Sequence, residues 1–112
     1  MQFSMTSYDK AKVVHMPEQL TITNAAAVKK DLVDLIDSGN TRLVLDLAGL
    51  NFSDSSGLAV LVAVFKAIEA KSGKTVLLSP QTNVRALLEL TRLHEIFEIF
   101  NNPQSAVERV SA

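Results

Sequence analysis

One segment constrains the fold of this chain more than any other: residues 43–65, which read LVLDLAGLNFSDSSGLAVLVAVF. The apolar run from Leu43 to Leu47 is bounded by polar residues and predicts a buried strand. A helix that is apolar on almost every face is expected to follow, from about Ser56 to Lys71. The loop between them places a carboxylate and several hydroxyl groups at the start of that helix.

The start of a helix favours anions, because its first backbone N–H groups are unpaired and carry partial positive charge. The residues expected there are Asp54, Ser55, Ser56 and Gly57. A phosphate on a serine at this point would act as a charge switch. Aspartate and serine are also ordinary capping residues, so Ser55 is expected to cap the helix, and a capping hydroxyl can still accept a phosphoryl group.

The run from Asp54 to Leu58, preceded by Leu45-Asp46-Leu47 and Phe52, resembles the signature of STAS domains in bacterial anti-sigma-factor antagonists. The resemblance covers nearly the whole chain. It implies that the serine after the aspartate, Ser55 here, is phosphorylated by a partner anti-sigma factor that is itself a serine kinase. The same resemblance assigns the support of the switch loop to its neighbours: Asp54, Ser56 and Gly57.

One position departs from the family pattern. The family has a Gly-x-Leu-Asp run that closes the second strand, whereas this chain reads PEQLT from Pro17 to Thr21. The leucine is kept, but the glycine and the aspartate are not. Since that aspartate lies near the switch serine in the family fold, Thr21 is expected to alter the local electrostatics and the rate of phosphorylation.

The chain has 112 residues and is 47% hydrophobic, which suits one domain with one core over residues 1–112. Apolar patterns and turn residues predict an α/β fold, and the resemblance implies that this fold is of the STAS type. It would hold a small mixed central sheet with an N-terminal hairpin, covered by about four helices. Beyond residues 43–65, the expected elements are a hairpin of residues 2–6 and 13–16, a helix over 24–38 stopped by Gly39, a strand over 75–78, a helix capped by Ser79-Pro80, a strand over 96–100 and a small helix capped by Asn102-Pro103.

Charge and composition disfavour several classes of partner. The formal net charge is −1 with both signs mixed along the chain, so nucleic acid binding is not expected. No cysteine is present, which excludes disulfides and thiolate chemistry. The N-terminal residues lack the apolar core of a signal peptide, and no apolar run approaches the length of a membrane span. We therefore expect a cytoplasmic protein that does not contact a membrane.

The helix after the loop carries more apolar surface than one sheet can cover. One stripe, formed by Leu58, Leu61 and Phe65 among others, suits packing on the sheet. A second stripe is predicted either to lie under a neighbouring helix or to receive a partner protein. We assign the second role to it as the working hypothesis, and its residues are Val60, Ala63, Val64 and Ala67.

Catalytic interpretations fit the sequence less well. The run from Ser72 to Thr75 imitates a phosphate-binding loop, but it follows a helix and precedes a strand, the reverse of the required order. Ser55 is not in a Gly-x-Ser-x-Gly elbow, and no spacing places His15 or His94 beside it. Asp46 is expected to make a polar contact at the end of its strand and Asp54 a loop or cap hydrogen bond. No cofactor, metal site or catalytic activity is predicted.

The resemblance therefore implies partner switching. The unmodified chain would capture an anti-sigma factor with serine kinase activity and so release a sigma factor. Phosphorylation of Ser55 would end the capture, and a PP2C-like phosphatase would reset it. The alternative is a STAS domain that serves as a structural or transport-complex subunit, in which the serine is never modified and the apolar helix is a permanent interface.

Overall fold

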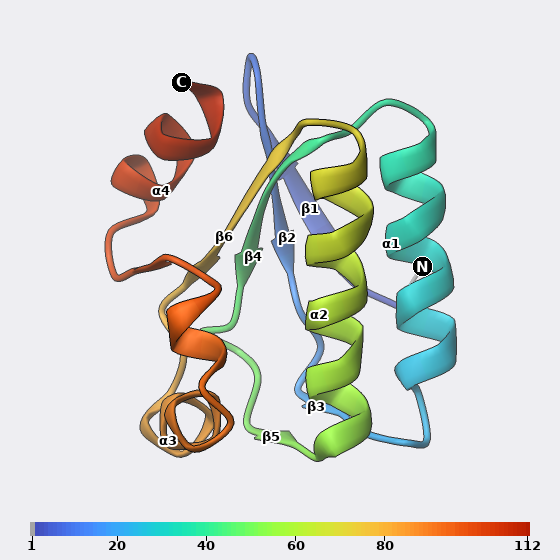
Figure 1. Ribbon diagram of the computed structural model, residues 1–112, viewed down its shortest axis with the longest axis vertical. Helices are drawn as coiled ribbons and strands as arrows, with labels where there is room; N and C mark the ends of the chain where they lie inside the picture. The colour runs from blue at the N-terminus through green and yellow to red at the C-terminus, as the bar shows by residue number, and fades with distance from the viewer. Residues whose placement is uncertain (1) are drawn as a thin grey trace.

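The computed structural model describes residues 2–112, in which strands and helices alternate along the chain (Figure 1). The strands are β1 (Ser4–Ser7), β2 (Lys12–His15), β3 (Gln19–Leu20), β4 (Arg42–Asp46), β5 (Phe52–Ser53), β6 (Lys74–Leu78) and β7 (Ile99–Phe100). The helices are α1 (Ala25–Asp37), α2 (Ser55–Ala70), α3 (Thr82–Leu90) and α4 (Pro103–Ser111), with a 3₁₀ helix, η1 (Leu93–Glu95). The predicted α/β class is confirmed.

The central sheet has the strand order β1-β2-β4-β6-β7. β1 and β2 form an antiparallel hairpin, and the remaining neighbours are parallel, so the sheet is mixed as predicted. β3 and β5 form a separate two-stranded parallel sheet, in which Gln19 pairs with Phe52 and Leu20 with Ser53. This small sheet was not predicted, because two-residue strands are too short to show an alternating pattern.

Helices cover both faces of the central sheet (Figure 1). α1 and α2 lie side by side against one face, and α4 lies against the other. The larger core fills the first of these spaces, and its fully buried side chains include Leu32, Leu45 and Leu61. A smaller core of Val13, Val44 and Val76 with residues of α4 fills the second. The β3–β5 sheet and the start of α2, which carry the signature loop, lie together at one end of the molecule (Figure 1).

Several predicted boundaries are confirmed. Gly39 follows α1 with φ of 110°, the left-handed backbone that favours glycine at a helix end. Asn102 caps α4, because its Oδ1 accepts the N–H of Ser105 at 2.9 Å, and Pro103 opens that helix. The prediction for α3 is wrong: Ser79 adopts a left-handed backbone with φ of 52°, and Gln81 holds the cap position two residues later. The last strand is also shorter than predicted, since Phe97 lies in the core and packs edge-on against Phe65.

Candidate functional site

Asp54 organises the start of α2. It is the N-cap residue, and its Oδ1 accepts the N–H of Gly57 at 3.0 Å. Its other carboxylate oxygen accepts the N–H of Ile22 at 3.0 Å, which joins the helix start to the segment between β3 and α1. The expectation that Ser55 caps the helix is therefore wrong, because Asp54 has the extended backbone and the hydrogen bond of a cap.

The same hydrogen bonds keep Asp54 ionised. Donation from the N–H of Ile22 is the main influence and lowers the pKa of the Asp54 carboxyl, while partial burial opposes it and the N–H of Gly57 adds to it. A donor that points at a carboxylate stabilises the charged form over the neutral one. Near neutral pH the site thus has a fixed negative charge next to the two serines.

Ser55 and Ser56 differ in their surroundings. Ser55 is the first residue of α2 and is exposed, whereas Ser56 is partly buried. Within residues 2–112, neither hydroxyl makes a hydrogen bond. Ser53, on the other side of the cap, is only 8% exposed and donates to the backbone oxygen of Asp54 at 3.1 Å. Of the three hydroxyl groups, that of Ser55 is therefore the one open to a partner.

Gly57 allows α2 to begin directly against β3. A Cβ at this position would overlap the backbone oxygen of Leu20 and the side-chain oxygen of Ser53. Any side chain would therefore push the first turn of the helix away from the small sheet. The loop-supporting role predicted for Asp54 and Gly57 has a physical basis in these contacts, although its link to a switch stays a proposal.

Thr21, the position that departs from the family pattern, lies beside this site. It directly precedes Ile22, whose N–H binds Asp54. Its Oγ1 accepts the N–H of Thr23 at 3.2 Å, and its own N–H donates to Asn24 Oδ1 at 2.9 Å. The threonine thus takes part in the turn that starts α1, and an aspartate here would bring a second carboxylate close to Asp54.

A hollow of about 280 Å³ lies between the N-terminal halves of α1 and α2. Ile22 stands at its edge with 76% of its surface exposed, a high value for a large apolar residue. Its wall is mainly apolar, with one cation from Lys29, and the lining residues are Ile22, Ala25, Ala26, Lys29, Ser56, Ala59 and Val60. Because Ser56 belongs to this wall, the hollow adjoins the position of Ser55.

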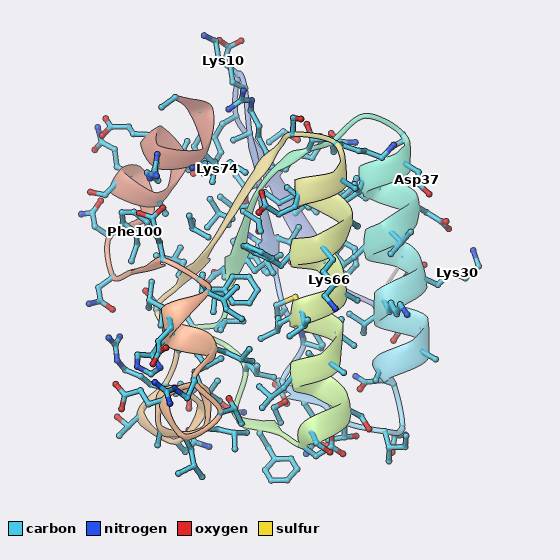
Figure 2. The ribbon with its side chains drawn as sticks, viewed as in Figure 1. Lys10, Lys30, Asp37, Lys66, Lys74 and Phe100 are labelled. Atoms are coloured by element: carbon cyan, nitrogen blue, oxygen red, sulfur yellow. The ribbon has the colours of Figure 1, made fainter. Side chains whose placement is uncertain are left out.

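The second apolar stripe of α2 needs a correction. Val60 and Val64 are only 3% and 0% exposed and belong to the core that also contains the buried face of α1. They are covered by the neighbouring helix, so the hypothesis that they form an exposed partner surface is wrong. Ala63 and Ala67 are half-buried. The solvent side of α2 is marked by Lys66, which points away from the sheet in Figure 2.

Side chains from the start of α3 fasten the β4–β5 loop. Gln81 Nε2 donates to the backbone oxygen of Ala48 and to Asn51 Oδ1, both at 2.8 Å. Asn83 Nδ2 donates to the backbone oxygen of Asn51 at 2.7 Å. On the other side, the N–H of Asn51 donates to the backbone oxygen of Glu18 at 2.7 Å. No sequence pattern pointed to this network, since the amides lie about 30 residues beyond the loop.

His15 and Asp46 form a second polar cluster that the sequence did not reveal. His15 Nδ1 lies 2.8 Å from Asp46 Oδ2, and its Nε2 lies 2.8 Å from the hydroxyl of Thr6. Asp46 also accepts the N–H of Ala48 at 3.0 Å, in agreement with the strand-end contact predicted for it. These partners occupy both ring nitrogens of His15, so they give it no part as a base for Ser55.

Other site classes receive no support from residues 2–112. No group of three or more histidine, cysteine, aspartate or glutamate side chains in this part of the chain could hold a metal ion. In the same residues, no helix combines the length and the apolar character needed to cross a membrane. The start of α2, with the adjoining hollow and loop, is therefore the candidate functional site.

Comparisons with known proteins point to one family. The STAS domain model matches residues 2–106. A Thermotoga maritima protein described as a candidate anti-sigma factor antagonist is 34% identical over 100 residues, which make up 88% of each chain. The anti-sigma F factor antagonist of Paenibacillus polymyxa is 27% identical over 108 residues, covering 96% of this chain and 92% of that one. A crystal structure of a Thermotoga maritima protein with the same description superposes with a TM-score of 0.91 at 31% identity, over 98% of this chain and 95% of the other.

Proposed function

The chain belongs to the STAS domain family, and from this premise we propose that it is an anti-sigma factor antagonist switched by phosphorylation of Ser55. Relatives that match along nearly their whole length carry the name of anti-sigma factor antagonist, a regulatory rather than a catalytic role. In its unmodified form the protein binds an anti-sigma factor and so releases a sigma factor. The observation that carries the site assignment is the exposed Ser55 at the start of α2, between residues that are engaged in the fold.

A phosphate on Ser55 is compatible with the folded protein. The group carries about −1.5 to −2 charges near neutral pH. It would lie at the positive end of α2, where a negative charge favours the helix. The neighbouring carboxylate of Asp54 is held by two backbone N–H groups, so the added repulsion falls on a residue that is well anchored. We therefore expect the modification to leave the stability of the fold nearly unchanged.

The same phosphate would strongly weaken the binding of a partner. Beside Ser55 lies the hollow lined by Ile22, Ala26 and Ala59, with Lys29 in its wall. We assign this hollow to the partner surface in place of the second stripe of α2; of that stripe, Val60 lines the hollow and Val64 does not. Ala63, which is half-buried and lies one turn further along α2, would extend it. A double negative charge at an apolar interface has to be desolvated, which costs several kcal/mol unless a cation answers it. A loss of about 4 kcal/mol weakens binding about a thousandfold.

The phosphoryl donor comes from outside this chain. We propose that the bound anti-sigma factor is a serine kinase that transfers the γ-phosphoryl group of ATP to the Ser55 hydroxyl. A PP2C-like phosphatase would hydrolyse the phosphoserine and restore binding. The chain then acts as a substrate and a binding module, with no catalysis of its own.

The test is to incubate the protein with magnesium, ATP and the purified serine-kinase anti-sigma factor of the same organism. We expect the intact mass to rise by one phosphoryl group, with the modification mapped to Ser55 by fragmentation. Ser55→Ala should stay unmodified and bind constitutively, and Ser55→Asp should bind poorly. Ser56→Ala is the matched control and should still accept phosphate. Phosphate found on Ser56, on Ser53 or nowhere would refute the assignment, and the last of these with stable binding would favour a permanent structural interface.

Thr21 offers a further test of the same site. Because it lies next to the Ile22 N–H that binds Asp54, Thr21→Asp should place a second carboxylate near the acceptor hydroxyl. We expect a measurable change in the rate of phosphorylation, while the affinity for the anti-sigma factor changes less. An identical rate would show that this position does not influence the reaction.

A further inference from the structure

Phe52 is an apolar side chain in an unusual place. It is 53% exposed, although it belongs to a strand and lies only three residues before Ser55. β5 runs between α3 and the start of α2, so Phe52 sits on the same end of the molecule as the proposed switch (Figure 1). A single exposed apolar residue is common on protein surfaces and by itself indicates nothing. The way in which the chain holds Phe52 is what makes it informative.

The backbone around Phe52 is fastened on both sides. Asn83 of α3 and Gln81, its cap residue, donate to Asn51, the residue before Phe52, at 2.7 and 2.8 Å. From the opposite side, the backbone oxygen of Glu18 accepts the N–H of Asn51 at 2.7 Å and that of Phe52 at 3.4 Å. The residue after it, Ser53, is buried. An exposed aromatic ring on a backbone fixed in this way loses little conformational freedom when a partner covers it.

We propose that Phe52 is the anchor by which the anti-sigma factor holds this protein, and that Gln81 and Asn83 are positioning residues that hold the anchor in place. The inference rests on the function proposed above and names the partner contact at the same site. The Phe52 side chain would insert into an apolar pocket of the anti-sigma factor. Aromatic side chains are enriched at the centres of protein interfaces, where one residue can supply a large share of the affinity.

The charges near Phe52 indicate which residues would surround that pocket on the partner. Two acidic residues are close to it along the backbone: Glu18, which is exposed and whose backbone oxygen accepts the N–H of Phe52, and Asp54, the cap residue two positions after Phe52. A complementary partner would therefore carry basic residues at the rim of an apolar pocket. The reversal Glu18→Lys should slow association with the anti-sigma factor, and the effect should fade at high salt.

The chain also limits where the phosphoryl donor can lie. Three residues of extended chain span at most about 10 Å between Cα atoms, so the backbone at Phe52 lies within about that distance of the backbone at Ser55. The pocket for Phe52 and the γ-phosphate that Ser55 attacks would therefore be neighbouring parts of the same partner. Phe52 would be bound equally in the ground state and in the transition state. Loss of such a uniform interaction raises the KM for this protein and leaves the kcat of its phosphorylation nearly unchanged.

The experiment measures the Kd for the same purified serine-kinase anti-sigma factor, together with KM and kcat. Phe52→Ala should raise Kd and KM about thirtyfold or more, as is usual for an anchor residue, and Phe52→Leu should fall between it and the wild type. Asn83→Asp, which keeps the shape but removes the donor, should raise both about fivefold to tenfold, as should Gln81→Ala. Leu90→Ala is the matched control, since Leu90 is 83% exposed on α3, and it should leave Kd unchanged.

The outcomes separate the two proposals. If the wild type binds and is phosphorylated but Phe52→Ala stays within threefold of it, the anchor assignment is refuted and the proposed function stands. If Leu90→Ala weakens binding as much as Phe52→Ala does, the effect belongs to general surface apolarity and the assignment also fails. If the wild type neither binds nor is phosphorylated, the proposed function itself is refuted. Thermal unfolding of the Phe52 and Leu90 variants must match the wild type closely, as expected for exposed positions.

Discussion

The substitution Gly57→Ala tests how closely the proposed switch loop and the fold depend on the same contacts. A Cβ on residue 57 would overlap the backbone oxygen of Leu20 and would lie 3.0 Å from the carbonyl carbon of that residue. It would also overlap the Ser53 side-chain oxygen, which can rotate away. Leu20 cannot move as easily, because it pairs with Ser53 in the small sheet and its oxygen accepts the N–H of Asp54 at 3.3 Å.

The size of the effect follows from two opposing contributions. Forcing one methyl group into a packed site costs about 1–3 kcal/mol. Alanine in place of glycine within a helix returns up to about 1 kcal/mol. We take the upper end of the first range, because the overlap is with main chain, and expect a net loss of about 2 kcal/mol in the free energy of unfolding. For a chain of this length, that lowers Tm by about 6–12 °C.

Thermal unfolding followed by circular dichroism, together with urea titration, measures this loss. Gly49→Ala is the matched control, because the nearest atom to its new Cβ would be the backbone oxygen of Met16 at 3.9 Å, an ordinary contact. That variant should unfold close to the wild type. The double variant Ser53→Ala/Gly57→Ala should recover only part of the loss. If Gly57→Ala unfolds within about 2 °C of the wild type, the Leu20 backbone can shift at little cost and the reasoning is refuted.

Three further changes test other parts of the structure. The Thr75 hydroxyl is buried without a hydrogen-bond partner in residues 2–112, so Thr75→Val should raise the free energy of unfolding in urea by about 1 kcal/mol; a decrease would mean that the hydroxyl is satisfied in solution. Val64→Ala should lower the free energy of unfolding by about 2 kcal/mol, because Val64 is 0% exposed. An unchanged free energy would show that Val64 is on the surface. The pKa of Asp54 is lowered in the folded protein, so the stability due to its ionised form is complete above its ordinary pKa of about 4 and is lost as the pH falls through the folded value. The difference in Tm between wild type and Asp54→Asn should therefore be constant near neutral pH and change only in acid, and a difference independent of pH throughout would contradict the role of the charge.

Periodicity predicts the long elements because each has one face in a core. The apolar residues of α1 recur at the spacing of a helix, with Val28, Leu32 and Ile36 buried, and β4 is apolar because helices cover both faces of the sheet. The start of α3 was misplaced because serine followed by proline satisfies the capping rule in sequence. In the structure the N–H of Ser79 instead donates to the backbone oxygen of Phe100 in β7, at 2.7 Å. A tertiary contact thus overrides the local signal.

Sequence reasoning identifies the loop that carries the site but not the contacts that shape it. The signature marks Asp54 to Gly57 through residue types alone. The donor that lowers the pKa of Asp54 belongs to Ile22, 32 residues earlier, and the amides that hold the loop come from α3. Whether the second stripe of α2 was buried depended on where α1 packs, which no pattern within α2 can reveal. For this reason the sequence alone did not show that Val60 and Val64 are buried.

Ser55 is the residue of the signature that the fold leaves uncommitted. Asp54 holds the N–H groups of Ile22 and Gly57, Gly57 has no room for a side chain, and Ser56 is part of the wall of the hollow. Of these three, Ser56 has the only hydroxyl, and a phosphate on it would lie in the mainly apolar wall of the hollow between α1 and α2. On Ser55 it would lie in solvent at the positive end of the helix, where it does not oppose folding. Modification there can act on the binding of a partner while the domain stays folded, which is the condition for a switch that is to be used repeatedly.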